Sequence, residues 1–307
     1  MGNDQLFKTI LERLLQDFLE LFFPEVAARL DFGSLSFVGK EVFANVPEGE
    51  VREADIVARL ATKDGEPKLV LVHVEVEAEH RGDFARRMFQ YYAVLRIHHR
   101  LRVLPIVLYL RGGPPSKFEE YREDIFGLEL LTFRYHSVAL ATLEAEEYVG
   151  TSPLGASLSA LMSWKKSRDR AALMASMLER VTGGGLNEAL KFLLVNVVKT
   201  FFVLTGKDAE RYRQLISRKE FRAVQEVELT WADKLMEKGR EEGLEKGREA
   251  GVIEGKRKTL LRQMSAKFGE VPEAMMVRVE VMSEADLDSV LERILTATTW
   301  DELKLGG

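Results

Sequence analysis

The spacing of apolar residues changes along the first part of the chain and predicts one helix followed by a pair of strands. Residues 5–23 place apolar side chains at helical intervals, and Pro24 lies where it would stop or kink that helix. Residues 35–46 are rich in β-branched and aromatic side chains, and residues 51–60 alternate apolar and polar positions as a strand does. We therefore expect these two segments to form a hairpin-like pair.

A further strand is predicted at residues 68–77, which are apolar at the start and strictly alternating at the end. That change is typical of a strand that leaves the core and reaches a solvated edge. Glu75 and Glu77 share one face of this strand because they are two positions apart. Residues 83–101 then predict a helix with one apolar face and arginines on the other, and residues 103–110 predict a buried strand.

The rest of the pattern separates an α/β domain from a helical region. After a loop rich in Gly and Pro at residues 111–115, residues 128–140 predict one further strand or hairpin. We expect the α/β domain to end shortly after this segment, so that it covers residues 1–151. Residues 152–235 predict several helices, with a glycine-rich break at residues 182–185.

Glycine recurs at every fourth position within the charged segment 236–256, at Gly239, Gly243, Gly247, Gly251 and Gly255. In a helix these glycines would form a stripe. Because a helical glycine costs up to ~1 kcal/mol relative to alanine, the stripe favours close packing against a partner helix, and a homodimer is the expected form. The alternative is a flexible charged linker. Residues 257–307 predict a small helical module with a helix stop at Phe268-Gly269.

Composition narrows the class of protein. The 307 residues are 46% hydrophobic and 30% charged, and no apolar run reaches the ~20 residues that span a bilayer, so we expect a globular protein without a membrane span. The N-terminus lacks a basic leader and a cleavage site, and cysteine is absent, so we expect a cytoplasmic protein whose metal sites use oxygen or nitrogen ligands.

Charge is unevenly distributed along the chain. The net charge is −5, which argues against a protein that coats nucleic acid by charge alone. Residues 81–102, however, carry a formal charge of +5, because one acid, Asp83, stands against six arginines. These are Arg81, Arg86, Arg87, Arg96, Arg100 and Arg102. These arginines could bind phosphate groups of a nucleic acid. The alternative is that they form a helix surface that stays in water.

Three carboxylates are predicted to converge at the edge of the sheet. Asp55 lies near one strand, and Glu75 and Glu77 lie about 7 Å apart on one face of the next. Two or three carboxylates can hold Mg²⁺ or Mn²⁺, which keeps several waters, and one such water can serve as a nucleophile. The alternative is that both glutamates are solvated on an exposed strand face and Asp55 is a turn acid. His73 shares that face, and we expect it to be a hydrogen-bonded strand histidine without a ligand role.

The residues around this cluster resemble a known family. The resemblance rests on three segments, Arg52-Glu-Ala-Asp55, Val72-His-Val-Glu75-Val-Glu77 and Phe84-Ala-Arg-Arg87-Met-Phe-Gln-Tyr91-Tyr. They are similar to the nuclease core of the recombination-promoting nuclease family, a branch of the PD-(D/E)XK superfamily, over residues 5–140. The resemblance implies a restriction-endonuclease-like α/β core with a mixed sheet flanked by helices, an appended helical C-terminal region, and metal-dependent cleavage of DNA.

The resemblance also implies roles for single residues. Asp55 and Glu75 would bind the metal ion, whereas the third position, usually lysine and often glutamine, is here Glu77. Glutamate can act as an extra ligand or a general base, but it cannot offset negative charge in the transition state, so we expect Arg87 to supply that charge. Secondary candidates are Glu25, Gln90 and Tyr91, for which the alternative is a structural role. The predicted DNA-contacting residues are Arg81, Arg86, Arg96 and Arg100.

Two functional classes remain open from the sequence. The first is a Mg²⁺- or Mn²⁺-dependent DNA endonuclease with a use in recombination or mobile elements. The second is a catalytically degenerate nuclease fold that acts as a nucleic-acid-binding or protein-interaction scaffold and dimerises through residues 236–256. Glu77 favours the second class, and metal binding would discriminate between the two.

Overall fold

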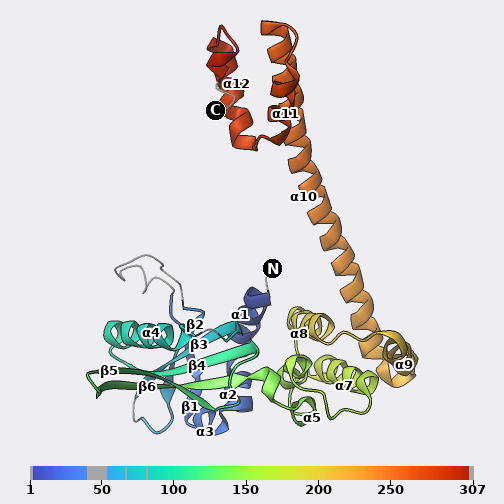
Figure 1. The fold of residues 1–307 in the computed structure, drawn as a ribbon. Helices are drawn as coiled ribbons and strands as arrows, with labels where there is room; N and C mark the ends of the chain where they lie inside the picture. The colour runs from blue at the N-terminus through green and yellow to red at the C-terminus, as the bar shows by residue number, and fades with distance from the viewer. Residues whose placement is uncertain (1–2, 40–53, 66–67, 81, 304–307) are drawn as a thin grey trace. The chain divides into compact units, whose positions relative to one another are not determined.

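The computed structural model describes residues 3–39, 54–65, 68–80 and 82–303, and it divides the chain into two compact units, Met1–Trp231 and Ala232–Gly307. The strands of the first unit are β1 (Leu30–Phe37), β2 (Ile56–Thr62), β3 (Leu69–Glu79), β4 (Arg102–Arg111), β5 (Phe118–Ile125) and β6 (Leu128–Ala139) (Figure 1). Its helices are α1 (Asn3–Arg13), α2 (Leu15–Phe22), α3 (Pro24–Ala27), α4 (Phe84–His99), α5 (Ala145–Tyr148), α6 (Pro153–Leu158), α7 (Arg170–Gly183), α8 (Glu188–Phe201), α9 (Gly206–Ile216) and the start of α10 (Arg222–Phe268).

One mixed sheet of six strands, in the order β1-β2-β3-β4-β6-β5, forms the centre of the first unit. Neighbours β1, β2 and β3 are antiparallel, β4 is parallel to β3, and β6 is parallel to β4. A parallel pair needs a crossover, which α4 provides between β3 and β4. The prediction of a mixed α/β core followed by helices is therefore confirmed.

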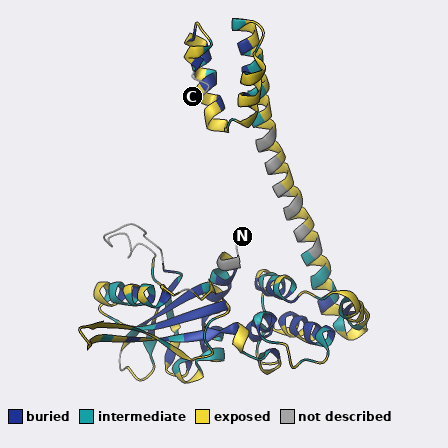
Figure 2. Cartoon of the chain, in the orientation of Figure 1, coloured by how far each residue is buried: buried dark blue, intermediate teal, exposed yellow. Residues whose placement is uncertain are grey.

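Helices pack against both faces of the sheet, as the buried residues of β3 show. Val72, Val74 and Val76 are buried in the same hydrophobic cluster as α1 and α2. On the opposite face, Leu71 is buried with Tyr91 of α4. Helices thus cover both faces, and Figure 2 shows buried residues concentrated in the central strands. The predicted strand, helix and strand over residues 68–110 correspond to β3, α4 and β4.

The single helix predicted over residues 5–23 is wrong in detail, because the structure has two helices there. Leu14, with φ −124° and ψ 32°, leaves the helical conformation between α1 and α2. This kink lets both segments bury apolar side chains, for example Phe7 and Phe18, against the sheet. Pro24 begins the short helix α3, a position where its missing N–H costs nothing.

The hairpin-like pair predicted from residues 35–46 and 51–60 corresponds to the antiparallel neighbours β1 and β2, although residues 40–53 lie outside the described part of the chain. Residues 128–140, predicted as a strand or a hairpin, contain the single strand β6, which forms a hairpin with the preceding strand β5. The strand β5 was missed because five of its eight residues are charged and most are exposed, which weakens the alternation signal. Phe126 and Gly127, with φ of 54° and 80°, form the turn between β5 and β6.

Helices α6 to α9 share the hydrophobic core of the sheet. The rings of Phe7 in α1 and Phe201 in α8 lie 5.7 Å apart, and the buried Ser157 hydroxyl donates a 3.0 Å hydrogen bond to the Leu194 carbonyl. The boundary predicted after residue 151 therefore lies inside the first compact unit. The predicted glycine-rich break separates α7 from α8, with Gly185 at φ 68°.

The second unit contains most of α10 together with α11 (Glu273–Val281) and α12 (Glu284–Thr296), which pack around Leu260 and Val290. α10 ends at Phe268, and Gly269 follows at φ 90°, as predicted for a helix stop. Residues 236–256 lie within continuous helix. A Cβ added at Gly243, Gly247, Gly251 or Gly255 would meet no atom within 4 Å, so packing of the stripe against a partner helix stays a prediction.

Among the described helices, none is both long enough and apolar enough to cross a membrane.

The contact between Phe7 and Phe201 gives a test of the shared core. Phe7→Ala should lower the free energy of unfolding by about 3–5 kcal/mol, because it empties a fully buried site between α1 and α8. Phe126→Ala is the matched control, since its ring is 100% exposed and its loss should be close to neutral. Urea unfolding measures both variants, and equal stabilities would contradict the shared core.

Candidate active site

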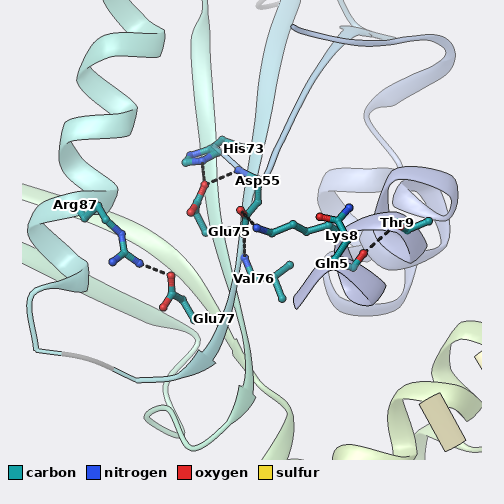
Figure 3. Close-up of polar contacts among 9 residues, drawn as sticks. All are labelled: Gln5, Lys8, Thr9, Asp55, His73, Glu75, Val76, Glu77 and Arg87. Carbon is teal, nitrogen blue, oxygen red and sulfur yellow. Dashed lines mark hydrogen bonds and ion pairs between the residues drawn. The ribbon is translucent and has the colours of Figure 1, made fainter. Parts of the chain in front are cut away.

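Asp55 and Glu75 come together where β2 leaves β3. The pairing of β2 with β3 starts at Ile56 opposite Val74, so β3 continues past that point without β2. There the Val76 N–H donates to Asp55 Oδ2 at 2.8 Å, and the Asp55 N–H donates to Glu75 Oε1 at 2.9 Å (Figure 3). Each acid is thus fixed by the other's strand segment, and the predicted proximity of Asp55 and Glu75 is confirmed.

His73 contacts the second acid, Glu75. Its Nε2 lies 2.7 Å from Glu75 Oε1, and both side chains are almost completely buried. A carboxylate can only accept a hydrogen bond, so in this contact the donor to an ionised Glu75 would be the imidazole Nε2. The Tyr91 ring packs edge-on against His73, with ring centroids 5.5 Å apart. His73 is therefore the hydrogen-bonded strand histidine that the sequence predicted, and it orients Glu75.

Lys8 in α1 was missed by the sequence analysis. Its Nζ lies 2.6 Å from Asp55 Oδ1, and its side chain is 21% exposed while that of Asp55 is 9% exposed. A single lysine in an amphipathic helix resembles any surface lysine, so nothing in the sequence pointed to it. The structure brings it to the acids because α1 packs across β2 and β3.

The two acids disturb each other electrostatically. Burial, and then the nearby charge of Glu75, raises the pKa of Asp55 to about 7, although the Lys8 ammonium and the Val76 N–H lower it. The pair therefore does not favour two full negative charges. A bound cation is the natural compensation for such a site.

Glu77 does not join this pair but is directed to Arg87 of α4, with which it forms an ion pair (Figure 3). Both side chains are about 15% exposed, at 15% and 14%, and the Arg87 guanidinium also lies 4.8 Å from the Phe84 ring. The predicted trio is thus separated into an Asp55–Glu75 pair and a Glu77–Arg87 pair. Within the described part of the chain, no group of three His, Asp or Glu residues could hold a metal ion.

The remaining donor set still suits one class of ion. Asp55 and Glu75 offer carboxylate oxygens, which are the ligands that Mg²⁺ and Mn²⁺ prefer. Mg²⁺ is commonly held by one or two carboxylates and completes its shell with water and phosphate oxygens. The residues present therefore fit such an ion with two protein ligands instead of three.

A second buried polar group flanks Glu77. Tyr109 is its register partner on β4, and both Tyr109 and Tyr135 are almost completely buried. Burial, and then the nearby Glu119 carboxylate, raises the pKa of both phenols, which therefore stay protonated. His80 Nε2 lies 3.2 Å from Glu119 Oε2 at the outer side. Apart from aromatic residues on strands, nothing in the sequence pointed to this group.

The secondary candidates lie in three different places. Tyr91 is buried and contacts His73, whereas Gln90 is exposed on α4. Glu25 is exposed on α3 and lines a pocket of about 600 Å³ together with His136 of β6. Neither Asp55 nor Glu75 lines that pocket. Tyr91 is thus the one secondary candidate with a contact to the site.

The predicted DNA-contacting arginines are exposed where the structure describes them. Arg86 and Arg96 lie on α4, and Arg100 follows its end at φ 55°. Arg81 lies outside the described residues. Arg87 differs from this group because it is largely buried against Glu77.

No protein-family model, curated protein or solved structure matches the chain. The resemblance to the recombination-promoting nuclease family therefore stays a prediction that rests on the motif residues.

The raised pKa of Asp55 predicts how stability depends on pH. The folded-state pKa lies near 7 and the unfolded value near 3.8, so the folded protein keeps a proton that the unfolded chain releases between these values. The free energy of unfolding of the metal-free protein should therefore fall by about 2–3 kcal/mol from about pH 5 to about pH 8.

Asp55→Asn is the variant that tests this assignment, because the amide can still accept from the Val76 N–H but cannot ionise. Urea unfolding in the presence of a chelator should show a clearly smaller fall over the same pH range. Glu79→Gln, an exposed acid further along β3, is the control. An unchanged slope in Asp55→Asn would contradict the role given to Asp55.

Proposed function

We propose that this protein is a divalent-metal-dependent DNA endonuclease with a restriction-endonuclease-like core, and that Asp55 and Glu75 bind the ion. The observation that carries the proposal is the pair itself, held by reciprocal hydrogen bonds at the end of β3, with Asp55 at a raised pKa. A buried acid pair of this kind destabilises the protein unless a cation compensates it. Such a cost is typical of a functional site.

The chain's own residues would orient the reaction. His73 fixes one oxygen of Glu75, and the Val76 N–H fixes one oxygen of Asp55. The ion would use the other oxygen of each acid, which at Asp55 is the oxygen that Lys8 contacts. A bound Mg²⁺ or Mn²⁺ would supply Lewis-acid chemistry and lower the pKa of a water. In the hydrolysis, a water oxygen would bond to phosphorus as the bond to the leaving sugar oxygen breaks, with one proton lost by the water and one gained by that sugar oxygen.

Arg87 would serve a supporting role. Its ion pair with Glu77 neutralises most of its charge, but arginine carries five N–H donors, and those not used by Glu77 can meet a phosphate oxygen. Arg86 and Arg96, exposed on the same helix, would hold the DNA backbone further along. DNA is thus the proposed partner, bound largely without regard to sequence.

A scaffold without catalysis is the second candidate, because Glu77 pairs with Arg87 and the acid pair lacks a third carboxylate among the described residues. In this case the helical segment 236–256 would join two copies of the chain. Titration calorimetry with MnCl₂ separates the candidates. Heat of binding that disappears in Glu75→Gln supports the nuclease, and no binding to the wild-type protein supports the scaffold.

Plasmid cleavage tests the nuclease proposal directly. Asp55→Ala and Glu75→Ala should each lower Mg²⁺- or Mn²⁺-dependent cleavage by about 100-fold or more, because each removes a ligand. Glu79→Ala removes an exposed acid from the same strand and should cleave like the wild type. Equal cleavage by all four proteins would show that any observed nuclease activity does not come from this site.

Salt dependence tests the proposed contact with DNA. Arg86→Ala and Arg96→Ala should each reduce the slope of log affinity against log salt by about 0.9, because each phosphate contact releases about one counterion. Arg222→Ala, which removes an exposed arginine of α10, should leave the slope unchanged. Fluorescence anisotropy of a labelled duplex measures the slope. Equal slopes for the three variants would exclude the α4 face as the DNA-binding surface.

A further inference from the structure

The contact between Lys8 and Asp55 is the feature with the clearest consequence beyond the proposed reaction. Lys8 belongs to α1, whereas Asp55 and Glu75 belong to the sheet. α1 is fixed in place because Phe7 and Leu11, on either side of Lys8, are completely buried. The lysine is therefore presented to the acids by a packed helix and not by a mobile loop.

The oxygens of the acid pair are already largely assigned. Asp55 Oδ2 accepts from the Val76 N–H, and Glu75 Oε1 accepts from both the Asp55 N–H and His73. The Asp55 oxygen left for a cation is Oδ1, and the Lys8 ammonium meets it at 2.6 Å. Lys8 thus stands where a divalent ion would bind Asp55.

An ammonium and a divalent ion on the same carboxylate oxygen disfavour each other. Mg²⁺ binds carboxylate oxygen at about 2.0–2.1 Å, so the ion and the ammonium would lie within a few ångströms and repel each other strongly. Binding of the divalent ion therefore favours departure of the ammonium from Asp55. The ammonium that leaves Asp55 stays tethered to α1 beside the site, because the helix itself is held by its buried residues.

We propose that Lys8 is an exchangeable cation that holds Asp55 in the metal-free protein, gives way to the divalent ion, and then meets the phosphate. This inference rests on the proposed metal-dependent cleavage. It gives the site a lysine although Glu77 occupies the strand position where the resembling family carries one. Lys8 would touch the substrate from a different element, α1, and offset negative charge on the phosphate as the leaving oxygen departs.

Titration calorimetry with MnCl₂ on the full chain tests the exchange without any activity measurement. Lys8→Met removes the competing ammonium, so its affinity for Mn²⁺ should rise by roughly tenfold, which corresponds to about 1.4 kcal/mol. Lys8→Arg keeps the charge and should bind like the wild type. Lys191→Met removes one positive charge from α8 and is the control for net charge. Lys8→Gln is a second neutral variant in case the methionine variant unfolds.

The same variants are then compared in plasmid cleavage at saturating Mn²⁺. Lys8→Met and Lys8→Gln should cleave about 100-fold more slowly than the wild type despite their tighter ion binding, and Lys8→Arg should restore part of the rate. Tighter binding together with slower cleavage is the combination that supports the proposal, because a merely structural lysine would not tighten binding.

Other outcomes overturn it. Equal Mn²⁺ affinities in the wild type and Lys8→Met would exclude the proposed exchange of Lys8 with the ion, while the acid pair would stand as a metal site. Unchanged cleavage by Lys8→Met and Lys8→Gln at saturating Mn²⁺ would exclude the proposed contact between Lys8 and the phosphate. Absence of Mn²⁺ binding in the wild type and in both neutral variants would overturn the proposed function and this inference together.

Discussion

The arrangement of the whole site depends on two hydrogen bonds that tie Asp55 to β3. The Val76 N–H, which β2 no longer reaches, donates to Asp55 Oδ2, and the Asp55 N–H donates in return to Glu75 Oε1. These bonds replace strand pairing beyond Ile56 and Val74 with a contact through side chains. A carboxylate that satisfies a backbone donor cannot easily move away, so the two acids are kept close despite their repulsion.

The side chains that contact the pair reduce the repulsion between the two acids. His73 forms a hydrogen bond with Glu75, Lys8 neutralises part of the charge on Asp55, and the remaining cost appears as the raised pKa of Asp55. A protein that needed only a stable strand end could satisfy Val76 with a neutral asparagine at position 55 and avoid that cost. The retention of two acids is what favours a cation-binding function over a structural one.

The sequence predicted the parts of the site that follow from periodicity. The alternation over residues 68–77 placed Glu75 and Glu77 on one face, and the apolar face of residues 83–101 placed α4 beside them. Periodicity says which face a side chain occupies but not which partner it chooses. Glu77 turned to Arg87, and Lys8 reached Asp55 from a helix about 50 positions earlier in the chain, because tertiary packing decides such pairs. The strand β5 escaped prediction for a related reason, since an exposed charged edge strand carries no apolar alternation.

The central claim is that Asp55 and Glu75 bind one divalent ion, and a crystal structure of the protein soaked in MnCl₂ tests it most directly. We predict an anomalous difference peak between the two carboxylates, within about 2.3 Å of one oxygen of each, and loss of the Lys8 contact to Asp55. A peak located elsewhere, or no peak with Lys8 still on Asp55 at saturating Mn²⁺, would contradict it.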